Sequence, residues 1–121
     1  MCGIVGYLGN KNGVTVVVDG LKKLEYRGYD SWGIAVKDSS GIKTYKKVGK
    51  IGALDPKKDL NGFAGNICIG HTRWATHGGV TEKNSHPHLS ASGRFAVAHN
   101  GIVENYQELR KSLEEKGIKF K

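Results

Sequence analysis

The chain has 121 residues, of which 38% are hydrophobic and 25% charged, a composition that predicts one soluble globular unit rather than a disordered chain. Its apolar runs are short, and no basic region is followed by a long apolar run, so we expect no membrane partner, no secretory signal and a cytoplasmic protein. The formal net charge of +8 raises the question of nucleic acid, but the lysine-rich stretch from Lys43 to Lys58 contains only Tyr45 as an aromatic, which fits a solvated face.

The first predicted elements are a strand, a helix and a hairpin. Residues Ile4–Leu8 form a short strand candidate, which places Cys2 at the start of a strand. From Val14 to Leu24 the apolar residues recur at helical spacing, and we predict a helix there although three consecutive valines lower its propensity. Further along, strands are predicted at Gly33–Lys37 and Lys43–Val48, joined as a hairpin across Asp38–Gly41, and at Asn66–Thr72 and Arg94–His99.

The last predicted elements are a helix and the start of a strand. Asn105 with Glu108 three residues later resembles a capping box, Leu109 and Leu113 supply an apolar side, and Gly117 ends the helix. Residues Ile118–Lys121 then alternate apolar and polar, the pattern of a half-buried strand. The sequence stops within this pattern, so we expect residues 1–121 to be part of a longer domain. Isolated from the rest, such a part would leave apolar faces and an unpaired edge and would be unstable or aggregate.

Cys2 is the first candidate for chemistry. It follows the initiator Met1 and precedes the small Gly3, a context in which we expect the methionine to be removed. Cys2 would then carry a free α-amine next to its thiol. The ordinary pKa values of an α-amine and a thiol lie close together, so the amine can accept the thiol proton near neutral pH. Cys2 is therefore a candidate nucleophile with its own base; the alternative is that position 2 simply tolerates Cys.

Two loops add polar groups that suit acyl transfer to an amino-acid substrate. Asn100-Gly101 can supply a side-chain amide and a backbone N–H to a developing oxyanion, although Asn-Gly is also a common hairpin turn. Arg73 can bind a carboxylate through two parallel N–H bonds, and the neighbouring Thr76 hydroxyl and Trp74 indole can bind and cover a ligand. The alternative for this second loop is an ordinary surface loop with a paired arginine.

A metal site is the competing interpretation of the histidines. Cysteine and histidine are concentrated in one part of the chain, at Cys68, His71, His77, His86, His88 and His99. None of them shows the tight spacing that defines a zinc site, and Cys68 lies between two isoleucines in a predicted strand. We therefore predict no metal, and a buried, inert Cys68.

Five motifs in order give the chain a family resemblance. They are Met1–Gly6, Leu24–Ser31, His71–Gly78, Asn84–His88 and His99–Ile102. Together they resemble the class II glutamine amidotransferases. The residues within the motifs are most similar to those of the glutamine:fructose-6-phosphate aminotransferase (glucosamine-6-phosphate synthase) family. The resemblance implies an α+β fold of the N-terminal-nucleophile hydrolase type, an αββα sandwich of which this chain would hold the first half.

The resemblance also implies roles for matching residues in the hydrolysis of L-glutamine to glutamate and ammonia, without a cofactor. Cys2 would be the nucleophile, and Asn100 with Gly101 the oxyanion hole. The substrate-binding residues would be Arg73, Trp74, Thr76, His77 and Arg27, with Trp74 at the lid and the segment Arg27 to Ser31 packed beside the nucleophile. An Asp that binds the glutamine α-amine is expected after residue 121. Fructose 6-phosphate would bind only to an isomerase part outside this chain, and the parent protein is expected to be a homo-oligomer.

Other functions stay open at this point. Another class II amidotransferase, similar to amidophosphoribosyltransferase, would hydrolyse glutamine in the same way but transfer the ammonia to a different acceptor. A catalytically inactive domain could bind glutamine without hydrolysing it. A basic module for RNA or another polyanion is supported only by net charge, and we predict no nucleic-acid partner.

Overall fold

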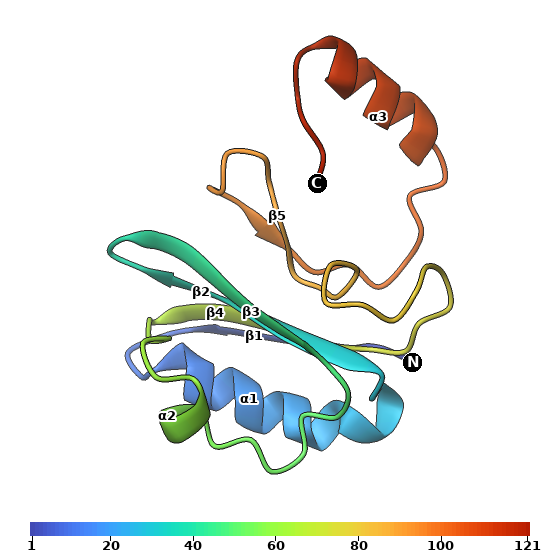
Figure 1. The fold of residues 1–121 in the computed structure, drawn as a ribbon. Coiled ribbons are helices and arrows are strands. Elements are labelled where there is room, and N and C mark those ends of the chain that lie inside the picture. The colour runs from blue at the N-terminus through green and yellow to red at the C-terminus, as the bar shows by residue number, and fades with distance from the viewer.

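The computed structural model describes residues 1 to 121, and its main layer is a four-stranded antiparallel sheet (Figure 1). The strands lie in the order β1-β4-β2-β3, so the first strand pairs with the fourth rather than with the second. They are β1 (Gly3–Leu8), β2 (Ser31–Asp38), β3 (Gly41–Val48) and β4 (Ile67–Arg73). This order places the start of the chain next to the end of β4, where the functional residues gather.

The helix α1 (Gly13–Leu24) covers one face of this sheet (Figure 1). The predicted helix is confirmed despite its valines, because burial of its apolar stripe outweighs their weak propensity at about 1.5–3 kcal/mol for each side chain. The buried apolar positions are Val14, Val17, Val18 and Leu21. The side chain of Asn12 accepts the Val14 N–H at 3.2 Å, so Asn12 is the N-cap of α1.

The core lies between α1 and the sheet. Trp32 and Ile34 of β2 are buried there together with Cys68 of β4, and burial raises the pKa of the Cys68 thiol to about 12. The prediction of a core Cys68 is confirmed. Gly70 of β4 lets the helix approach, because a side chain there would come within 2.5 Å of Val17.

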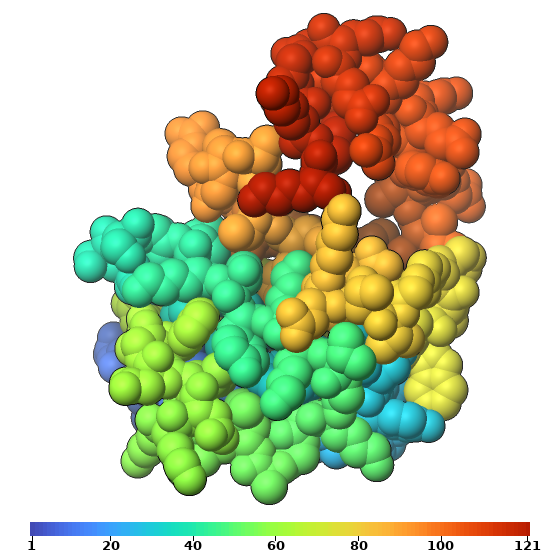
Figure 2. Space-filling view, in the orientation of Figure 1, coloured from blue at the N-terminus to red at the C-terminus, as the bar shows by residue number.

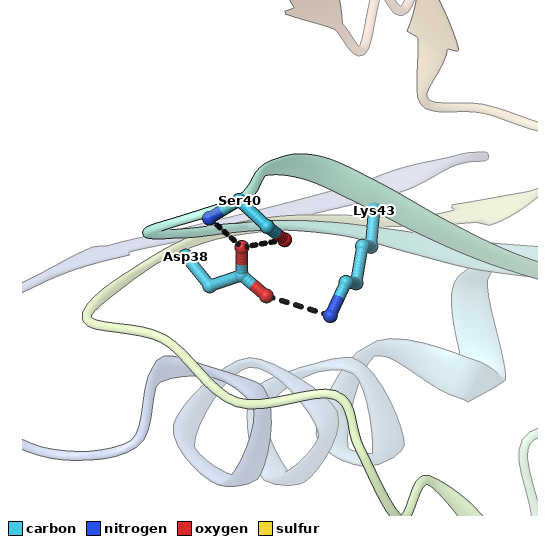
Figure 3. Close-up of polar contacts among 3 residues, drawn as sticks. All are labelled: Asp38, Ser40 and Lys43. Atoms are coloured by element: carbon cyan, nitrogen blue, oxygen red, sulfur yellow. Dashed lines mark hydrogen bonds and ion pairs between the residues drawn. The ribbon is translucent and has the colours of Figure 1, made fainter.

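Asp38 stabilises the turn of the hairpin between β2 and β3 (Figure 3). Its Oδ1 accepts the Ser40 backbone N–H at 2.7 Å and the Ser40 hydroxyl at 2.6 Å, and its Oδ2 lies 2.7 Å from Lys43 Nζ. These contacts, the Lys43 bond first, hold the pKa of Asp38 well below its usual range. Gly41 follows with φ +127, a conformation that favours glycine. The predicted hairpin is confirmed.

The later part of the chain contains less β structure than the sequence predicts. After α2 (Pro56–Asp59) and β4, the strands β5 (His88–Leu89) and β6 (Ala96–Val97) pair only with each other. The strand predicted at Arg94–His99 is thus reduced to two residues, and the strand predicted at Ile118–Lys121 is wrong. An alternating pattern makes a strand only where a neighbouring strand accepts its backbone hydrogen bonds. β6 has only the two-residue β5 as a neighbour, and Ile118–Lys121 pairs with no strand.

The helix α3 (Tyr106–Glu115) is confirmed, as is its end at Gly117, where φ is +84. The predicted capping box is wrong: Asn105 has a ψ of 26 rather than an extended one, and its side chain makes no cap hydrogen bond. No residue of α3 is buried, and in Figure 2 the helix forms a lobe that projects from the body of the molecule. Its apolar side, Leu109 and Leu113, is exposed.

None of the helices combines the length and the apolar character needed to cross a membrane.

Candidate active site

One cavity of about 320 Å³ brings most of the predicted site residues together. Three parts of the chain meet there: its start, the end of β4 with the loop that follows, and the segment after β6. From the predicted set, the lining includes Cys2, Arg73, Trp74, Thr76, His77, Asn100 and Gly101. His71, His86, His99 and Ile102 complete the lining and were not predicted as site residues.

The sheet register places Cys2 against the end of β4. Gly3 pairs with Thr72, so the residue before β1 lies next to the residues that leave β4. The Cys2 sulfur accepts the backbone N–H of Trp74 at 3.3 Å, and the thiol can donate to the Trp74 carbonyl oxygen at 3.7 Å. An N–H that points at the sulfur stabilises negative charge on it once the thiol has lost its proton.

Met1 is anchored at the short helix η1 (Glu25–Arg27). Its amino group donates to the Arg27 carbonyl oxygen at 2.6 Å, and Arg27 Nη2 lies 3.7 Å from the Met1 sulfur. Arg27 does not line the first cavity but lines a second one, of about 470 Å³, together with Met1 and Cys2. In this form the Cys2 nitrogen belongs to a peptide bond, so it can act as a base only after Met1 is removed.

Arg73 organises the loop after β4 from inside. Its Nη1 donates to the Gly79 carbonyl oxygen at 3.0 Å and its Nη2 to that of His77 at 2.6 Å, and only 7% of the residue is exposed. The Thr76 hydroxyl lies 3.0 Å from His77 Nδ1. Part of the Arg73 fork is thus engaged by the loop backbone, and the remaining guanidinium N–H groups are left for a ligand.

Asp30 anchors the other side of the same loop; its segment was expected beside the nucleophile, but no role was assigned to the residue itself. Its carboxylate accepts the Ala75 backbone N–H and the Ser31 hydroxyl, the latter at 2.8 Å. Its own N–H donates to the Arg73 carbonyl oxygen at 3.1 Å. Asp30 therefore fixes the backbone on both sides of Trp74, although nothing in its local sequence identifies this distant contact.

The residues before Asp30 pack closely on the site. A Cβ on Gly28 would lie 2.9 Å from the Arg73 carbonyl carbon and 3.1 Å from the Met1 carbonyl oxygen, so only glycine allows this approach. The Tyr29 ring meets the Trp74 ring edge-on, with 5.2 Å between centroids. Trp74 is 45% exposed and lines the cavity.

Asn100 connects the nucleophile to a buried histidine. Its Nδ2 donates to the Cys2 carbonyl oxygen at 3.2 Å, and its Oδ1 lies 2.7 Å from His71 Nε2. The predicted Asn100-Gly101 pair does not end a strand directly, since β6 ends at Val97. It still reaches the cavity, where a side chain at Gly101 would collide with the His99 ring at 2.9 Å.

Three histidine rings, here called the histidine stack, pack next to this contact: His86 stacks on His71 and meets His88 edge-on. The rings of His71 and His86 lie 4.6 Å apart, and those of His86 and His88 lie 4.4 Å apart. Burial lowers the pKa of His86 to about 4, with further lowering by the neighbouring histidines, Arg73 and Lys46. Burial also lowers the pKa of His88. The structure contains no group of three or more His, Cys, Asp or Glu side chains placed to hold a metal ion.

The cavity thus combines the Cys2 thiol, N–H donors, and a loop that Arg73 and Asp30 hold in place. Trp74 N–H faces the sulfur, and the Asn100 amide donates to the carbonyl oxygen of the same cysteine. Such an arrangement suits nucleophilic attack on a carbonyl carbon, since the donors can stabilise the negative charge that develops.

Comparison with protein families supports this chemistry. A family profile described as a glutamine amidotransferase domain matches residues 55–121. Curated relatives named glutamine–fructose-6-phosphate aminotransferase [isomerizing] are 53% identical in Thermus thermophilus, 56% in Gloeobacter violaceus and 54% in Clostridium perfringens. Each alignment covers 100% of this chain and 20% of the relative. The chain therefore spans about a fifth of the length of these relatives.

Solved structures give the same picture of the fold. A glutamine phosphoribosylpyrophosphate amidotransferase from B. subtilis matches with a TM-score of 0.77 and 29% identity, over 100% of this chain and 26% of that chain. A structure described as the allosteric regulatory enzyme of purine biosynthesis matches with a TM-score of 0.76 and 30% identity, over the same shares. The likeness confirms the predicted N-terminal-nucleophile hydrolase class of fold, of which this chain holds a part.

Proposed function

The chain belongs to the glutamine amidotransferase domain family, and from this membership we propose that it hydrolyses L-glutamine to glutamate and ammonia with Cys2 as the nucleophile. One observation carries the proposal. The Cys2 sulfur lies at the start of β1, hydrogen-bonded to the Trp74 N–H and in the same cavity as Asn100 and Gly101.

The proposed reaction begins once Met1 has been removed. The α-amine of Cys2 takes the thiol proton, and the sulfur attacks the side-chain amide carbon of glutamine. The free N–H of the Asn100 amide and the backbone N–H of Gly101 stabilise the oxyanion of the tetrahedral intermediate. The C–N bond then breaks, the amine of Cys2 returns the proton to the leaving nitrogen, and ammonia departs. Water, deprotonated by the same amine, attacks the thioester, which releases glutamate and restores the thiol.

The loop after β4 is proposed to bind the amino-acid end of glutamine. Thr76 and His77 are exposed at the cavity and can donate or accept hydrogen bonds. Arg73 would contribute the N–H groups that the loop backbone does not use. Trp74 would close over the ligand and exclude water, while Arg27 would shape the neighbouring cavity on the other side of Cys2.

The acceptor of the ammonia is proposed from the relatives. Identities of 50–56% over this chain are to proteins named glutamine–fructose-6-phosphate aminotransferase, against 29% to the phosphoribosylpyrophosphate amidotransferase structure. We therefore favour fructose 6-phosphate as acceptor, converted to glucosamine 6-phosphate by a part of the protein other than these residues, within a homo-oligomer. An amidophosphoribosyltransferase-like acceptor is the second candidate, supported by the similarity of fold.

The proposed chemistry also suits the cytoplasm. Both cysteines are free thiols, and a reducing compartment keeps a nucleophilic thiol available. Hydrolysis through Cys2 needs no cofactor, and glutamine rather than a nucleic acid is the proposed ligand.

The test is the release of glutamate from glutamine by the intact protein. Wild type is expected to turn over glutamine and not asparagine, whose side chain is one methylene shorter. Cys2→Ala, whose small side chain still permits removal of Met1, is expected to lose all turnover. A variant with Lys inserted between Met1 and Cys2 keeps the thiol but not its free amine, and it should also be inactive. Turnover in Cys2→Ala would contradict the proposal, and binding of glutamine by wild type without turnover would indicate an inactive binding domain.

A further inference from the structure

His71 is a fully buried, titratable side chain that lines the cavity beside the nucleophile, and the proposed reaction does not use it. The residue lies on β4, is 1% exposed, and faces Gly33 of β2 in the sheet register. Its Nε2 lies 2.7 Å from Asn100 Oδ1. Two hydrogen bonds, His71 to Asn100 and Asn100 to the Cys2 carbonyl oxygen, connect it to the main chain of Cys2.

The hydrogen-bond partners determine the direction of this contact. The Cys2 carbonyl oxygen can only accept, so the Asn100 atom that faces it must be the donor Nδ2. The opposite atom of the amide, Oδ1, then faces His71 and needs a donor. His71 must therefore carry its proton on Nε2.

The second ring nitrogen keeps His71 in this form. Nδ1 is buried and has no hydrogen-bond partner, and an unpaired acceptor there costs less than an unpaired N–H or a positive charge would. Burial lowers the pKa of His71, and the Arg73 cation adds to the lowering, while the Asn100 bond and Asp30 act against it. The ring also stacks on His86, which limits its rotation.

We propose that His71 is a positioning residue whose Nε2–H holds the Asn100 amide with Nδ2 turned toward Cys2. Without this bond the amide could rotate by half a turn and present its oxygen to the oxyanion, which would repel it. The inference rests on the proposed function, because it assigns to Asn100 the stabilisation of negative charge during attack by Cys2. It concerns the orientation of a donor, so its loss should affect the chemical step more than the binding of substrate.

Variants of His71 in the intact protein test this role. His71→Leu removes the donor and is expected to lower kcat for glutamine hydrolysis roughly tenfold to a hundredfold, with KM changed by less than about threefold. His71→Gln retains an N–H that can reach Asn100 Oδ1 and should recover most of the loss. The rate at which iodoacetamide alkylates Cys2, which needs no oxyanion site, should be the same in all variants. His88→Leu, at the outer end of the histidine stack, is the matched control and should retain the wild-type kcat.

Two results would overturn the proposal: His71→Gln no more active than His71→Leu, or alkylation of Cys2 slowed in parallel with hydrolysis. A double-mutant cycle gives a further test, since His71→Leu should cost nothing more once Asn100 is already Ala. If His71→Leu does not fold, ¹⁵N NMR of the wild-type protein still shows which ring nitrogen of His71 carries the proton. We expect a neutral His71 with the proton on Nε2 at pH 7, and a proton on Nδ1 would contradict it. Because the NMR measurement does not depend on turnover of glutamine, it separates a failure of the role proposed for His71 from a failure of the proposed function.

Discussion

The backbone N–H of Trp74 points at the sulfur of Cys2, with 3.3 Å between nitrogen and sulfur. The two residues meet across 72 positions of sequence because β1 pairs with β4. On the other side of Trp74, Asp30 holds the Ala75 N–H. The environment of the nucleophile thus depends on the order of the strands in the sheet and on the half-buried Asp30, and both can be tested.

Replacing Asp30 should loosen the loop that carries Trp74. Asp30→Ala removes the acceptor of the Ala75 N–H and of the Ser31 hydroxyl, and we expect kcat/KM for glutamine to fall by about 10- to 100-fold. Steady-state hydrolysis measures this. Asp59→Ala is the control, because Asp59 also accepts a backbone N–H, that of Asp55, but far from the site. Equal activity of the two variants would show that Asp30 has no positioning role.

Gly28 should not tolerate a side chain. In Gly28→Ala the new Cβ would meet the Arg73 carbonyl carbon at 2.9 Å, and backbone atoms cannot move aside as a side chain can. We expect a loss of about 1–3 kcal/mol in the free energy of unfolding, measured by urea denaturation. Gly6→Ala, in β1, is the control, since its Cβ would lie at an ordinary contact distance of 3.9 Å from Ile69. A stable Gly28→Ala protein would mean that the backbone approach is looser than described.

The histidine stack should make stability depend on pH. Folded, His86 stays neutral down to its lowered pKa of about 4, whereas in the unfolded chain it takes up a proton near its ordinary pKa of 6.5. Between these values the unfolded state binds more protons, so stability falls as pH falls from about 6.5 to about 4.

We expect a loss of about 1–2 kcal/mol from His86, because solvent screens a half-buried ring. Thermal unfolding between pH 7 and pH 4.5 measures the effect. His86→Gln should reduce the pH dependence, while His77→Gln, at an exposed position, should leave it unchanged. If the thermal stability of these two variants depended on pH in the same way, the histidine stack would not be the source of the pH dependence.

Cys68 should be inert in the folded protein. Its thiol is buried and its pKa is raised to about 12, so almost no thiolate forms at pH 8. Mass spectrometry after iodoacetamide treatment should show one label on native protein, at Cys2, and two labels in urea. Cys68→Ala should still take one label when native. Two labels on native wild type would mean that β4 opens.

The local structure could be predicted where one segment carries the whole signal. The helix from Val14 to Leu24 followed from spacing alone, and the hairpin followed from the turn at Asp38–Gly41. The strand expected at Ile118–Lys121 failed for the opposite reason, because pairing needs a neighbour that alternation cannot supply. The order of strands in the sheet is likewise a property of distant segments and had no signal in any single motif.

The same distinction applies to the site. Cys2 and Asn100 could be proposed from residue type and position, and the structure brings both to one cavity. His71 and Asp30 stand in the quoted motifs, but their roles could not be predicted, because these lie in contacts with Asn100 and Ala75 that join separate parts of the chain. Arg73 lies at the cavity as expected, yet part of its fork binds the loop backbone, which sequence cannot reveal.

The measurement that tests the nucleophile most directly is the intact mass of the protein after incubation with 6-diazo-5-oxo-L-norleucine, an electrophilic analogue of glutamine. Wild type without Met1 should gain one adduct, located on Cys2 by peptide mapping and prevented by excess glutamine. Cys2→Ala and the variant with Lys inserted before Cys2 should gain none, while Cys68→Ala should label like wild type. No adduct on a protein whose Met1 has demonstrably been removed, or an adduct that survives Cys2→Ala, would contradict an N-terminal cysteine nucleophile.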